Sequence, residues 1–431
     1  MTEFGPATTQ LHTGYRPGTP EFTVIPPIHQ STAYEFSSLA EARAKFALDQ
    51  PGYIYSRNAN PTQAVFEARV AALEGGVSAV AVASGQAAVA ITALALAGRG
   101  GHIVAAQQLY GGTVDLFDDT LRDLGIETTF VDVDDIDGWR EAVRPETRLF
   151  FAESVANPVA QMLDISQVAD VAHEAGVPLV VDNTTTTPAL LRPKEFGADI
   201  VVHSATKFLG GHGQALGGVV VDLGTFDFSI EPDRWPSLFQ PHWRYGGVAL
   251  WDRFGADMSF AALLRSKYIS DLGPTLSAFS AAQLLTGLET LDLRIARHVH
   301  NAALVARYLS DHPAVRVVFH PSLSSNPWHA AAQRYLPNGA PSVFAFELLP
   351  GTEDEVTLVE RFIDNLKLVK LVANIGDART LITHPASMTH NHMTPVQLAA
   401  AGISPATIRL SVGLENPEDI IADLDQAFAA L

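Results

Sequence analysis

The chain contains no cysteine among its 431 residues and few basic side chains for its length. Without cysteine, disulfides, thiolate catalysis and cysteine-bound zinc or iron–sulfur clusters are excluded. The 28 Lys and Arg residues stand against 47 Asp and Glu residues, which gives a formal net charge of −19. No basic cluster is present that would neutralise a phosphate backbone, so we expect no nucleic-acid partner.

Signals for export and for membrane insertion are also missing. The N-terminus has no basic segment followed by an apolar one, so no secretion signal is visible. Together with the absence of cysteine, this fits a cytoplasmic location. Residues 77–98 are apolar enough to resemble a membrane span, but Ser84, Gly85 and Gln86 interrupt them. This pattern is typical of a strand, a turn and a buried helix, so we expect no membrane partner.

The length and the 47% of apolar residues predict an ordinary globular enzyme of two or three domains. Residues 1–61 are rich in Pro, Gly, Thr and aromatics with little periodicity, which indicates an arm that contacts a neighbouring subunit. Residues 62–280 alternate apolar runs with helical stretches, which predicts an α/β fold with a mostly parallel central sheet and helices on both faces. Residues 281–431 begin with a long predicted helix, Leu284–Leu309, and form a smaller C-terminal α+β domain. The predicted strands are Ala79–Ala83, His102–Ala106, Glu127–Val131, Arg148–Ala152, Pro178–Val181, Ile200–His203, Gly218–Val221, Val315–Phe319, Val343–Glu347 and Thr407–Ser411.

Small or polar side chains follow five of these predicted strands, at the carboxyl ends where open α/β sheets bind their ligands. In chain order these groups are Ser84-Gly85-Gln86, Tyr110, Asn157, Asp182, and Ser204 with Thr206 and Lys207. Each alone has a plain structural interpretation: a tight turn, a packed ring, an Asn-Pro turn, a capping aspartate, a solvated lysine. Because chance would rarely assemble all five, we favour a common binding site.

A lysine at the end of one buried strand, with an aspartate at the end of a nearby strand, is what pyridoxal phosphate (PLP) requires. The amine of Lys207 would form the Schiff base, and Asp182 would keep the pyridine nitrogen protonated so that the ring can withdraw electrons. Gly85 would let the backbone and the start of a helix approach the phosphate. Tyr110 would place its ring flat on the cofactor, and the amide of Asn157 would bond the ring hydroxyl.

Two other interpretations deserve comparison. Gly211–Gly217 contains several glycines, but their spacing does not match the G-x-G-x-x-G pattern of dinucleotide-binding proteins. A metal site built from His384, His390 and His392 is less favoured than polar loop histidines, because no further ligand follows at helical spacing. A non-catalytic binding protein on the same fold is a further alternative, although every catalytic position is occupied.

Seven ordered motifs carry a resemblance to a known family over nearly the whole chain. They are Tyr55-Ser56-Arg57 with Asn60-Pro61-Thr62, Ser84-Gly85-Gln86-Ala87-Ala88, Tyr110-Gly111-Gly112, Asp182-Asn183-Thr184, Ser204-Ala205-Thr206-Lys207, His384–His390, and Arg409–Glu415. The chain thus resembles the Cys/Met-metabolism family of PLP-dependent enzymes, which have the fold type I (aspartate aminotransferase-like) architecture. Val155-Ala156 departs from the Pro-containing stretch often seen before Asn157-Pro158, which affects only the detail of that loop.

The resemblance implies a role for each matching residue. Lys207 would carry the cofactor, Asp182 would pair with the pyridine nitrogen, and Tyr110 would stack on the ring and move a proton. Gly85, Gln86, Ser204 and Thr206 would bind the phosphate, and the cofactor-binding set also includes Ser84, Asn157 and Thr184. Tyr55 and Arg57 would reach the phosphate from a neighbouring subunit, which implies an active-site dimer and, as is usual in the family, a homotetramer. Arg409, with Asn374 and Tyr55, would bind the substrate, unless Arg409 instead forms a salt bridge with Glu415 or another acid.

Within the family, three features resemble the O-acetylhomoserine sulfhydrylase branch: Asn374-Ile375-Gly376-Asp377, the run His203–Gly213, and the aromatic-rich insertion Phe226–Trp251. This implies γ-replacement on O-acetyl-L-homoserine by sulfide or methanethiol, giving homocysteine or methionine. A cystathionine γ-synthase, a methionine or cystathionine γ-lyase and an O-succinylhomoserine sulfhydrylase remain open alternatives.

Overall fold

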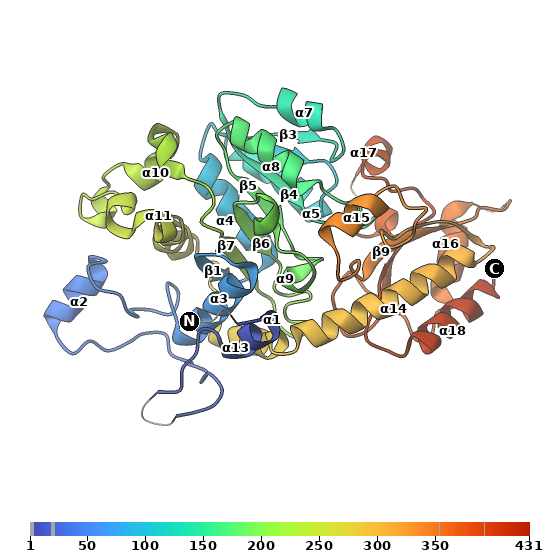
Figure 1. Ribbon diagram of the computed structural model, residues 1–431, viewed down its shortest axis with the longest axis horizontal. Coiled ribbons are helices and arrows are strands. Elements are labelled where there is room, and N and C mark those ends of the chain that lie inside the picture. The colour runs from blue at the N-terminus through green and yellow to red at the C-terminus, as the bar shows by residue number, and fades with distance from the viewer. Residues whose placement is uncertain (1–3, 19–21, 353, 392) are drawn as a thin grey trace.

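A computed structural model describes residues 4–18, 22–352, 354–391 and 393–431 of the chain. The fold is organised around two β-sheets, each covered by helices. Figure 1 shows the larger sheet near the middle of the molecule and the smaller one toward the C-terminus. The strands of the large sheet are β1 (Ser78–Val82), β2 (His102–Ala106), β3 (Glu127–Val131), β4 (Thr147–Glu153), β5 (Leu179–Asp182), β6 (Ile200–His203) and β7 (Gly218–Asp222). Those of the small sheet are β8 (Val315–Phe319), β9 (Val343–Leu348), β10 (Lys370–Leu371), β11 (Leu381–Thr383) and β12 (Thr407–Ser411).

The strand order of the large sheet is β1-β7-β6-β5-β4-β2-β3. Only β7 runs antiparallel to its neighbours, β1 and β6, and the other pairs are parallel. All seven predicted strands of this region are therefore confirmed, and so is the mostly parallel sheet. Leu149–Ala152 and Leu179–Val181 are buried because helices cover both faces of such a sheet, and this explains their unbroken apolar character.

The helices of the large region follow the strands and pack on the sheet. Helix α8 shows why: its buried residues Ile165, Val168, Ala169 and Ala172 recur at helical spacing, and Asp164 caps its first turn by accepting the Gln167 amide. The helices up to the small sheet are α1 (Pro6–His12), α2 (Leu39–Phe46), α3 (Pro61–Glu74), α4 (Gly85–Ala97), α5 (Gly111–Asp115), α6 (Leu121–Asp123), α7 (Ile136–Glu141), α8 (Ile165–Glu174), α9 (Thr187–Leu190), α10 (Pro236–Phe239), α11 (Leu250–Leu263), α12 (Ser270–Leu272), α13 (Ala278–Leu288) and α14 (Leu291–Asp311). The later ones are α15 (His329–Tyr335), α16 (Glu355–Asp364), α17 (Pro395–Ala400) and α18 (Pro417–Phe428).

The prediction of one long helix over Leu284–Leu309 is wrong. The chain forms α13 and α14 instead, and Thr290 between them leaves the helical region with φ −124° and ψ 20°. The carbonyl of Gly287 at the end of α13 accepts a hydrogen bond from the Arg294 guanidinium at 2.7 Å, and the Glu289 carbonyl accepts one from the Gln10 side chain. These side-chain donors replace helical bonds that an unbroken helix would form at these carbonyls.

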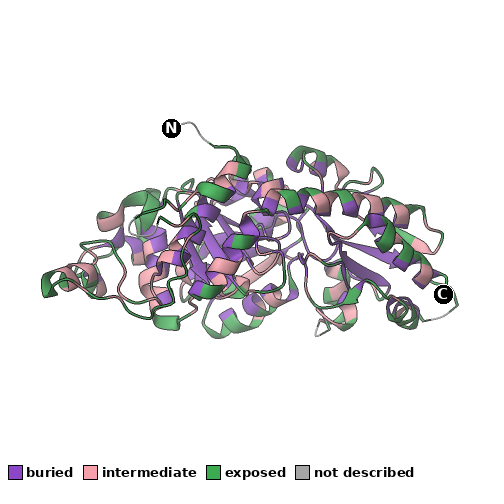
Figure 2. Ribbon diagram, turned by 90° about the horizontal axis from the view of Figure 1, so that it is seen from below, coloured by how far each residue is buried: buried purple, intermediate pink, exposed green. Residues whose placement is uncertain are grey.

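The small sheet has the order β10-β11-β12-β9-β8 and is mainly antiparallel. The three strands predicted here are confirmed, while β10 and β11 are too short to have been recognised. Figure 2 shows the buried residues concentrated on the strands of the two sheets.

The N-terminal segment contains two different parts. Helix α1 packs on α3 and α14, and the buried Gln10 donates to Asp292. From residue 22 to residue 59, by contrast, no residue is buried, and Figure 1 shows this segment with α2 extending away from the large sheet. The predicted contact of this arm with a neighbouring subunit stays a prediction.

No helix formed by the described residues combines the length and the apolar character that a bilayer crossing requires.

Candidate active site

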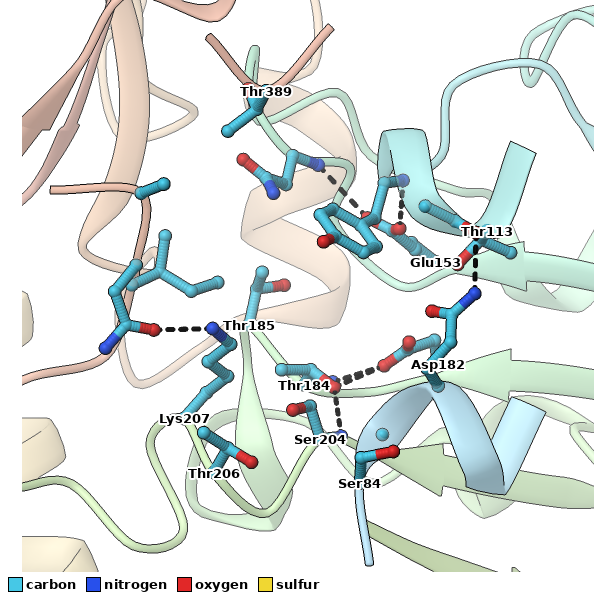
Figure 3. Close-up of a pocket in the computed structure, with 18 of the residues that line it drawn as sticks. Ser84, Thr113, Glu153, Asp182, Thr184, Thr185, Ser204, Thr206, Lys207 and Thr389 are labelled. Atoms are coloured by element: carbon cyan, nitrogen blue, oxygen red, sulfur yellow. Dashed lines mark hydrogen bonds between the residues drawn. The ribbon is translucent and has the colours of Figure 1, made fainter. Parts of the chain in front are cut away.

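A cavity of about 710 Å³ opens at the carboxyl ends of the central strands. The structure brings together twelve of the residues singled out from the sequence, and Figure 3 shows the polar side chains converging on this cavity. The twelve are Ser84, Gly85, Gln86, Tyr110, Asn157, Asp182, Thr184, Ser204, Thr206, Lys207, Asn374 and Arg409. This is the sheet edge at which a parallel α/β fold binds its ligand.

Lys207 follows β6 in a tight turn, in which its amide donates to the Ser204 carbonyl at 3.1 Å. Its amine lies 2.5 Å from Oδ1 of Asn374, a residue of the C-terminal region. Burial, and to a smaller extent the charge of Arg409, lowers the pKa of Lys207 to about 8. A considerable part of this amine is therefore neutral near physiological pH, which makes it a competent nucleophile and base.

Asp182 is the last residue of β5 and faces the cavity. Its Oδ1 accepts from both the amide (3.0 Å) and the hydroxyl (2.5 Å) of Thr184, whose Oγ1 in turn accepts the amide of Ser204 at 2.8 Å. Burial raises the pKa of Asp182, although the bonds from Thr184 act in the opposite direction. No Lys or Arg of the described residues forms an ion pair with this carboxylate, so a cationic ring nitrogen would supply the missing partner.

The start of helix α4 forms an anion seat. The Ser84 hydroxyl caps this helix by accepting the Ala87 amide at 3.1 Å. The amides of Gly85 and Gln86, in the first turn, have no helical partner and remain available to a ligand. A β-carbon on Gly85 would lie 2.5 Å from that of Ser204, so only glycine allows the helix start and the β6 turn to come this close.

Thr206 lies at the same cavity, but its hydroxyl is engaged elsewhere. It donates to the carbonyl of Gly217 at 3.1 Å and accepts the amide of that residue at 3.0 Å. It thereby ties the turn that carries Lys207 to the segment that enters β7. The role in phosphate binding implied for Thr206 stays a prediction.

Arg409, on β12, is 3% exposed and reaches the cavity from the small sheet. Its guanidinium donates to Asn157 Oδ1 (3.2 Å), to the Asn374 carbonyl (3.0 Å) and to Thr383 Oγ1 (2.8 Å), while its Nε has no partner. Burial lowers its pKa to about 10, so it is still charged at neutral pH. Because no carboxylate of the described residues pairs with this buried cation, it suits an anionic ligand.

The alternative pairing of Arg409 with Glu415 is wrong. The carboxylate of Glu415 instead accepts from the amide (2.7 Å) and the hydroxyl (2.8 Å) of Thr380. It therefore braces the segment beside β11 and leaves the arginine free to face the cavity.

Tyr110 is the N-cap residue of helix α5 and is 45% exposed at the cavity. A β-carbon on Gly112 would lie 2.7 Å from Cε1 of Tyr110, so the glycine makes room for the ring. The carbonyl of Gly112 accepts from the Gln86 side chain at 2.6 Å, which joins the starts of α4 and α5.

Sequence reasoning missed one functional candidate, Glu153. It is the last residue of β4, lines the cavity and accepts the amides of Tyr110 and Asn157. The available signal was its place at a strand end, directly before the residues already considered.

Tyr55 and Arg57 are not brought to the cavity within one chain. They lie in the exposed arm, where the Arg57 guanidinium lies 5.4 Å from the center of the Tyr55 ring. Their implied contribution to the site of a neighbouring subunit stays a prediction.

The two competing interpretations can be compared with the structure. The glycine-rich run Gly211–Gly217 leads directly into strand β7, whereas the dinucleotide motif must open a helix. Both ring nitrogens of His384 are engaged, with Ser387 Oγ at 2.7 Å and with the Pro405 carbonyl at 2.9 Å. His390 is buried beside Thr389, and His392 lies outside the described residues.

The donor set fits PLP. The first-turn amides of α4, which have no partner within the helix, suit a phosphate. The carboxylate of Asp182, which pairs with no Lys or Arg of the described residues, suits a protonated pyridine, and the partly neutral amine of Lys207 suits an aldehyde.

Comparison with known proteins agrees with this fit. Residues 7–429 match the family described as Cys/Met metabolism PLP-dependent enzyme. The O-acetyl-L-homoserine sulfhydrylase of Corynebacterium glutamicum is 46% identical, with 100% of this chain and 98% of that protein covered. The enzyme of the same name from Leptospira meyeri is 43% identical over 98% of this chain and 96% of that protein.

Among solved structures, a putative O-acetylhomoserine (thiol)-lyase from Campylobacter jejuni, which contains N'-pyridoxyl-lysine-5'-monophosphate, superposes with a TM-score of 0.95. It is 37% identical and covers 99% of this chain and 100% of its own. The chain therefore belongs to the Cys/Met-metabolism family of PLP-dependent enzymes, and its cofactor is pyridoxal 5'-phosphate.

Proposed function

We propose that this protein catalyses γ-replacement on O-acetyl-L-homoserine, in which sulfide or methanethiol displaces acetate and gives homocysteine or methionine. The observation that carries the proposal is the placement of two basic side chains at one cavity, Lys207 and the buried Arg409, both bonded to the same residue, Asn374. An amino-acid substrate needs such an arrangement, since its α-amine must reach the cofactor while its carboxylate is held. The two sulfhydrylases that cover nearly the whole chain support the choice of substrate.

Each residue of the cavity has a place in this proposal. Lys207 would hold the cofactor through its aldehyde, Asp182 would bond the ring nitrogen, and Ser84, Gly85, Gln86, Ser204 and Thr206 would surround the phosphate. Thr184 would fix the carboxylate of Asp182, and Asn157 would bond the ring hydroxyl. When bound, PLP withdraws electrons from the substrate α-carbon, which makes the α- and β-protons removable.

The chain's own groups would move the protons and orient the substrate. Arg409 would bind the α-carboxylate with N–H groups that have no protein partner, including Nε. The amine of Lys207, once displaced by the substrate amine, would take the α-proton, pass it to the cofactor and then help move a β-proton, and a pKa of about 8 suits these transfers near neutral pH. The Tyr110 hydroxyl is our candidate for proton transfer near the γ-carbon, from which acetate leaves.

The assembly and the domain division are part of the same proposal. Tyr55 and Arg57, in the segment 22–59 that has no buried residue, would complete the cavity of a second copy, in an active-site dimer that pairs further into a homotetramer. Residues 1–61 would act as this arm, 62–280 as the cofactor-binding domain and 281–431 as the domain that binds the substrate carboxylate. We expect the enzyme to work in the cytoplasm.

Product analysis tests the proposed function. Purified enzyme supplied with O-acetyl-L-homoserine should release acetate and form homocysteine only when sulfide is added. Formation of 2-oxobutanoate without sulfide would indicate a γ-lyase, and cystathionine formed from added cysteine would indicate a cystathionine γ-synthase. Parallel reactions with O-succinylhomoserine and with methanethiol would identify the preferred donor and acceptor, and a preference for the succinyl ester would contradict the proposal.

A further inference from the structure

Glu153 is a buried acid at the cavity that the proposed reaction does not yet use. It ends strand β4, is 7% exposed and points among the polar groups seen in Figure 3. Its Oε1 accepts the main-chain amide of Tyr110 at 2.5 Å, and its Oε2 accepts that of Asn157 at 3.1 Å. One carboxyl group therefore joins the loop after β2 to the loop after β4.

The two residues that Glu153 holds form different walls of the cavity. Tyr110 begins α5 and presents its ring to the cavity, while the Asn157 side chain accepts the Arg409 guanidinium at 3.2 Å. Glu153 thus holds the main chain of Tyr110, the proposed ring-stacking group. It also holds the main chain of Asn157, whose side chain contacts Arg409, the proposed carboxylate-binding residue. A small displacement at Glu153 would move both.

The surroundings of Glu153 disfavour the ionised form of its carboxyl group. None of the ion pairs formed by the described residues includes Glu153, and the charge that acts on it is that of a second carboxyl, Asp182. Burial, and then the charge of Asp182, raises the pKa of Glu153 to about 8, whereas the two amide bonds favour its ionised form. Since a buried acid without a cation destabilises a fold, a geometric function that no apolar side chain can perform would explain its presence.

We propose that Glu153 is a positioning residue of this enzyme, which fixes the Tyr110 ring against the face of the cofactor and the Asn157 amide against Arg409 through two main-chain hydrogen bonds. The expected effect on turnover rests on the proposed function, whereas the positioning of Tyr110 against the cofactor rests only on the family's use of PLP.

Three substitutions test this role. Glu153→Gln keeps the size but offers one oxygen and one NH₂ group to two amide donors, so at least one bond is lost. Glu153→Asp keeps the carboxyl group but is one methylene shorter, so it cannot reach both loops. Asp222→Asn is the matched control, because Asp222 is a buried acid of β7 that likewise accepts a main-chain amide, that of Gly224 at 3.0 Å, away from the cavity.

The first measurement needs neither cofactor nor substrate. In the apoprotein of Glu153→Gln, hydrogen exchange at the Tyr110 or Asn157 amide should accelerate by roughly tenfold or more, and the control should leave both unchanged. In the holoenzyme, the visible circular dichroism of bound PLP should change, because the ring of Tyr110 shifts. The kcat for O-acetyl-L-homoserine should fall by about 10- to 100-fold and its KM should rise, since a misplacement near 1 Å has effects of this size.

Each outcome decides the inference. Unchanged exchange in both Glu153 variants would overturn it. Faster exchange with wild-type dichroism, kcat and KM would also overturn it, because Glu153 would then stabilise the loops without positioning anything. If the wild-type enzyme fails to convert O-acetyl-L-homoserine, the proposed function is contradicted. Hydrogen exchange and circular dichroism still test the positioning role of Glu153 in that case. If Glu153→Gln does not fold, Glu153→Asp provides the same readouts.

Discussion

Substitution of Arg409 should separate substrate binding from cofactor binding. The guanidinium has five N–H donors, and three of the hydrogen bonds they form go to Asn157, Asn374 and Thr383. The bond lengths of 2.8 to 3.2 Å fix its orientation before any substrate arrives. Two donors, including the buried Nε, remain for the α-carboxylate.

The magnitude follows from those two donors. A hydrogen bond between charged groups contributes about 1.5–3 kcal/mol, so two contribute about 3–6 kcal/mol. At about 1.4 kcal/mol per tenfold change, Arg409→Gln should lower kcat/KM for O-acetyl-L-homoserine by about 10²- to 10⁴-fold. Arg409→Lys keeps the charge but loses the planar fork, so one bond can survive and the loss should be about 10- to 100-fold.

The assay is steady-state kinetics with the ester varied at saturating sulfide, and then with sulfide varied. The KM for sulfide should stay near the wild-type value, because sulfide has no carboxylate. PLP content and thermal unfolding show whether the variants are folded, and Arg316→Gln, which removes an arginine paired with Glu347 and Glu355 away from the cavity, is the matched control. If Arg409→Gln retains the wild-type kcat/KM for the ester, the carboxylate binds elsewhere and the reasoning fails.

Three further results are expected. Lys207→Ala should abolish turnover, and borohydride reduction should no longer add the pyridoxyl mass to the protein; retained turnover would contradict the assignment. Because burial lowers the pKa of Lys207 to about 8 and only the neutral amine attacks an aldehyde, the rate at which the apoprotein captures PLP should rise with pH up to about 8 and then level off; a rise that continues toward 10.5, the usual lysine value, would refute this. Gly218→Ala should destabilise the fold by about 1–3 kcal/mol in denaturant unfolding, because its β-carbon would lie 2.0 Å from the Ser84 carbonyl. Gly351→Ala, with no atom within 4 Å of the new carbon, is the control and should have little effect on stability. If the two variants were equally stable, the main chain at Ser84 would have to move aside at little cost, which would contradict the prediction.

The central sheet could be predicted because its strands are buried on both faces. Runs such as Leu179–Val181 are apolar throughout and end at a polar residue, here Asp182, so both the strand and its functional end are visible in the sequence. The break between α13 and α14 could not be predicted, because the apolar periodicity continues through Glu289 and Thr290. The helix is interrupted there by side-chain contacts: Gln10, which is distant in the chain, bonds the Glu289 carbonyl, and Arg294, in the first turn of α14, bonds the Gly287 carbonyl.

The candidate site was predictable to the same extent and for a related reason. Residue type indicates the chemistry that a side chain can perform, so Lys207, Asp182 and Arg409 could be identified from their motifs. Hydrogen-bond direction does not follow from residue type, and the sequence therefore gives no sign that the Thr206 hydroxyl turns to Gly217. For the same reason, the contact of Glu153 with two main-chain amides became visible only in three dimensions.

Asn374 connects the two halves of the proposed chemistry. Its side-chain oxygen bonds the Lys207 amine at 2.5 Å, and its main-chain oxygen bonds the Arg409 guanidinium at 3.0 Å. Lys207 follows the large sheet and Arg409 lies on the small one, so the distance between the proposed amine site and carboxylate site depends on a contact between the two regions. An α-amino acid has a fixed distance between its amine and its carboxylate. We therefore expect a substrate of this class to fit only while Asn374 holds the two regions at this distance, so that residues about 200 positions apart in the chain can serve one small molecule.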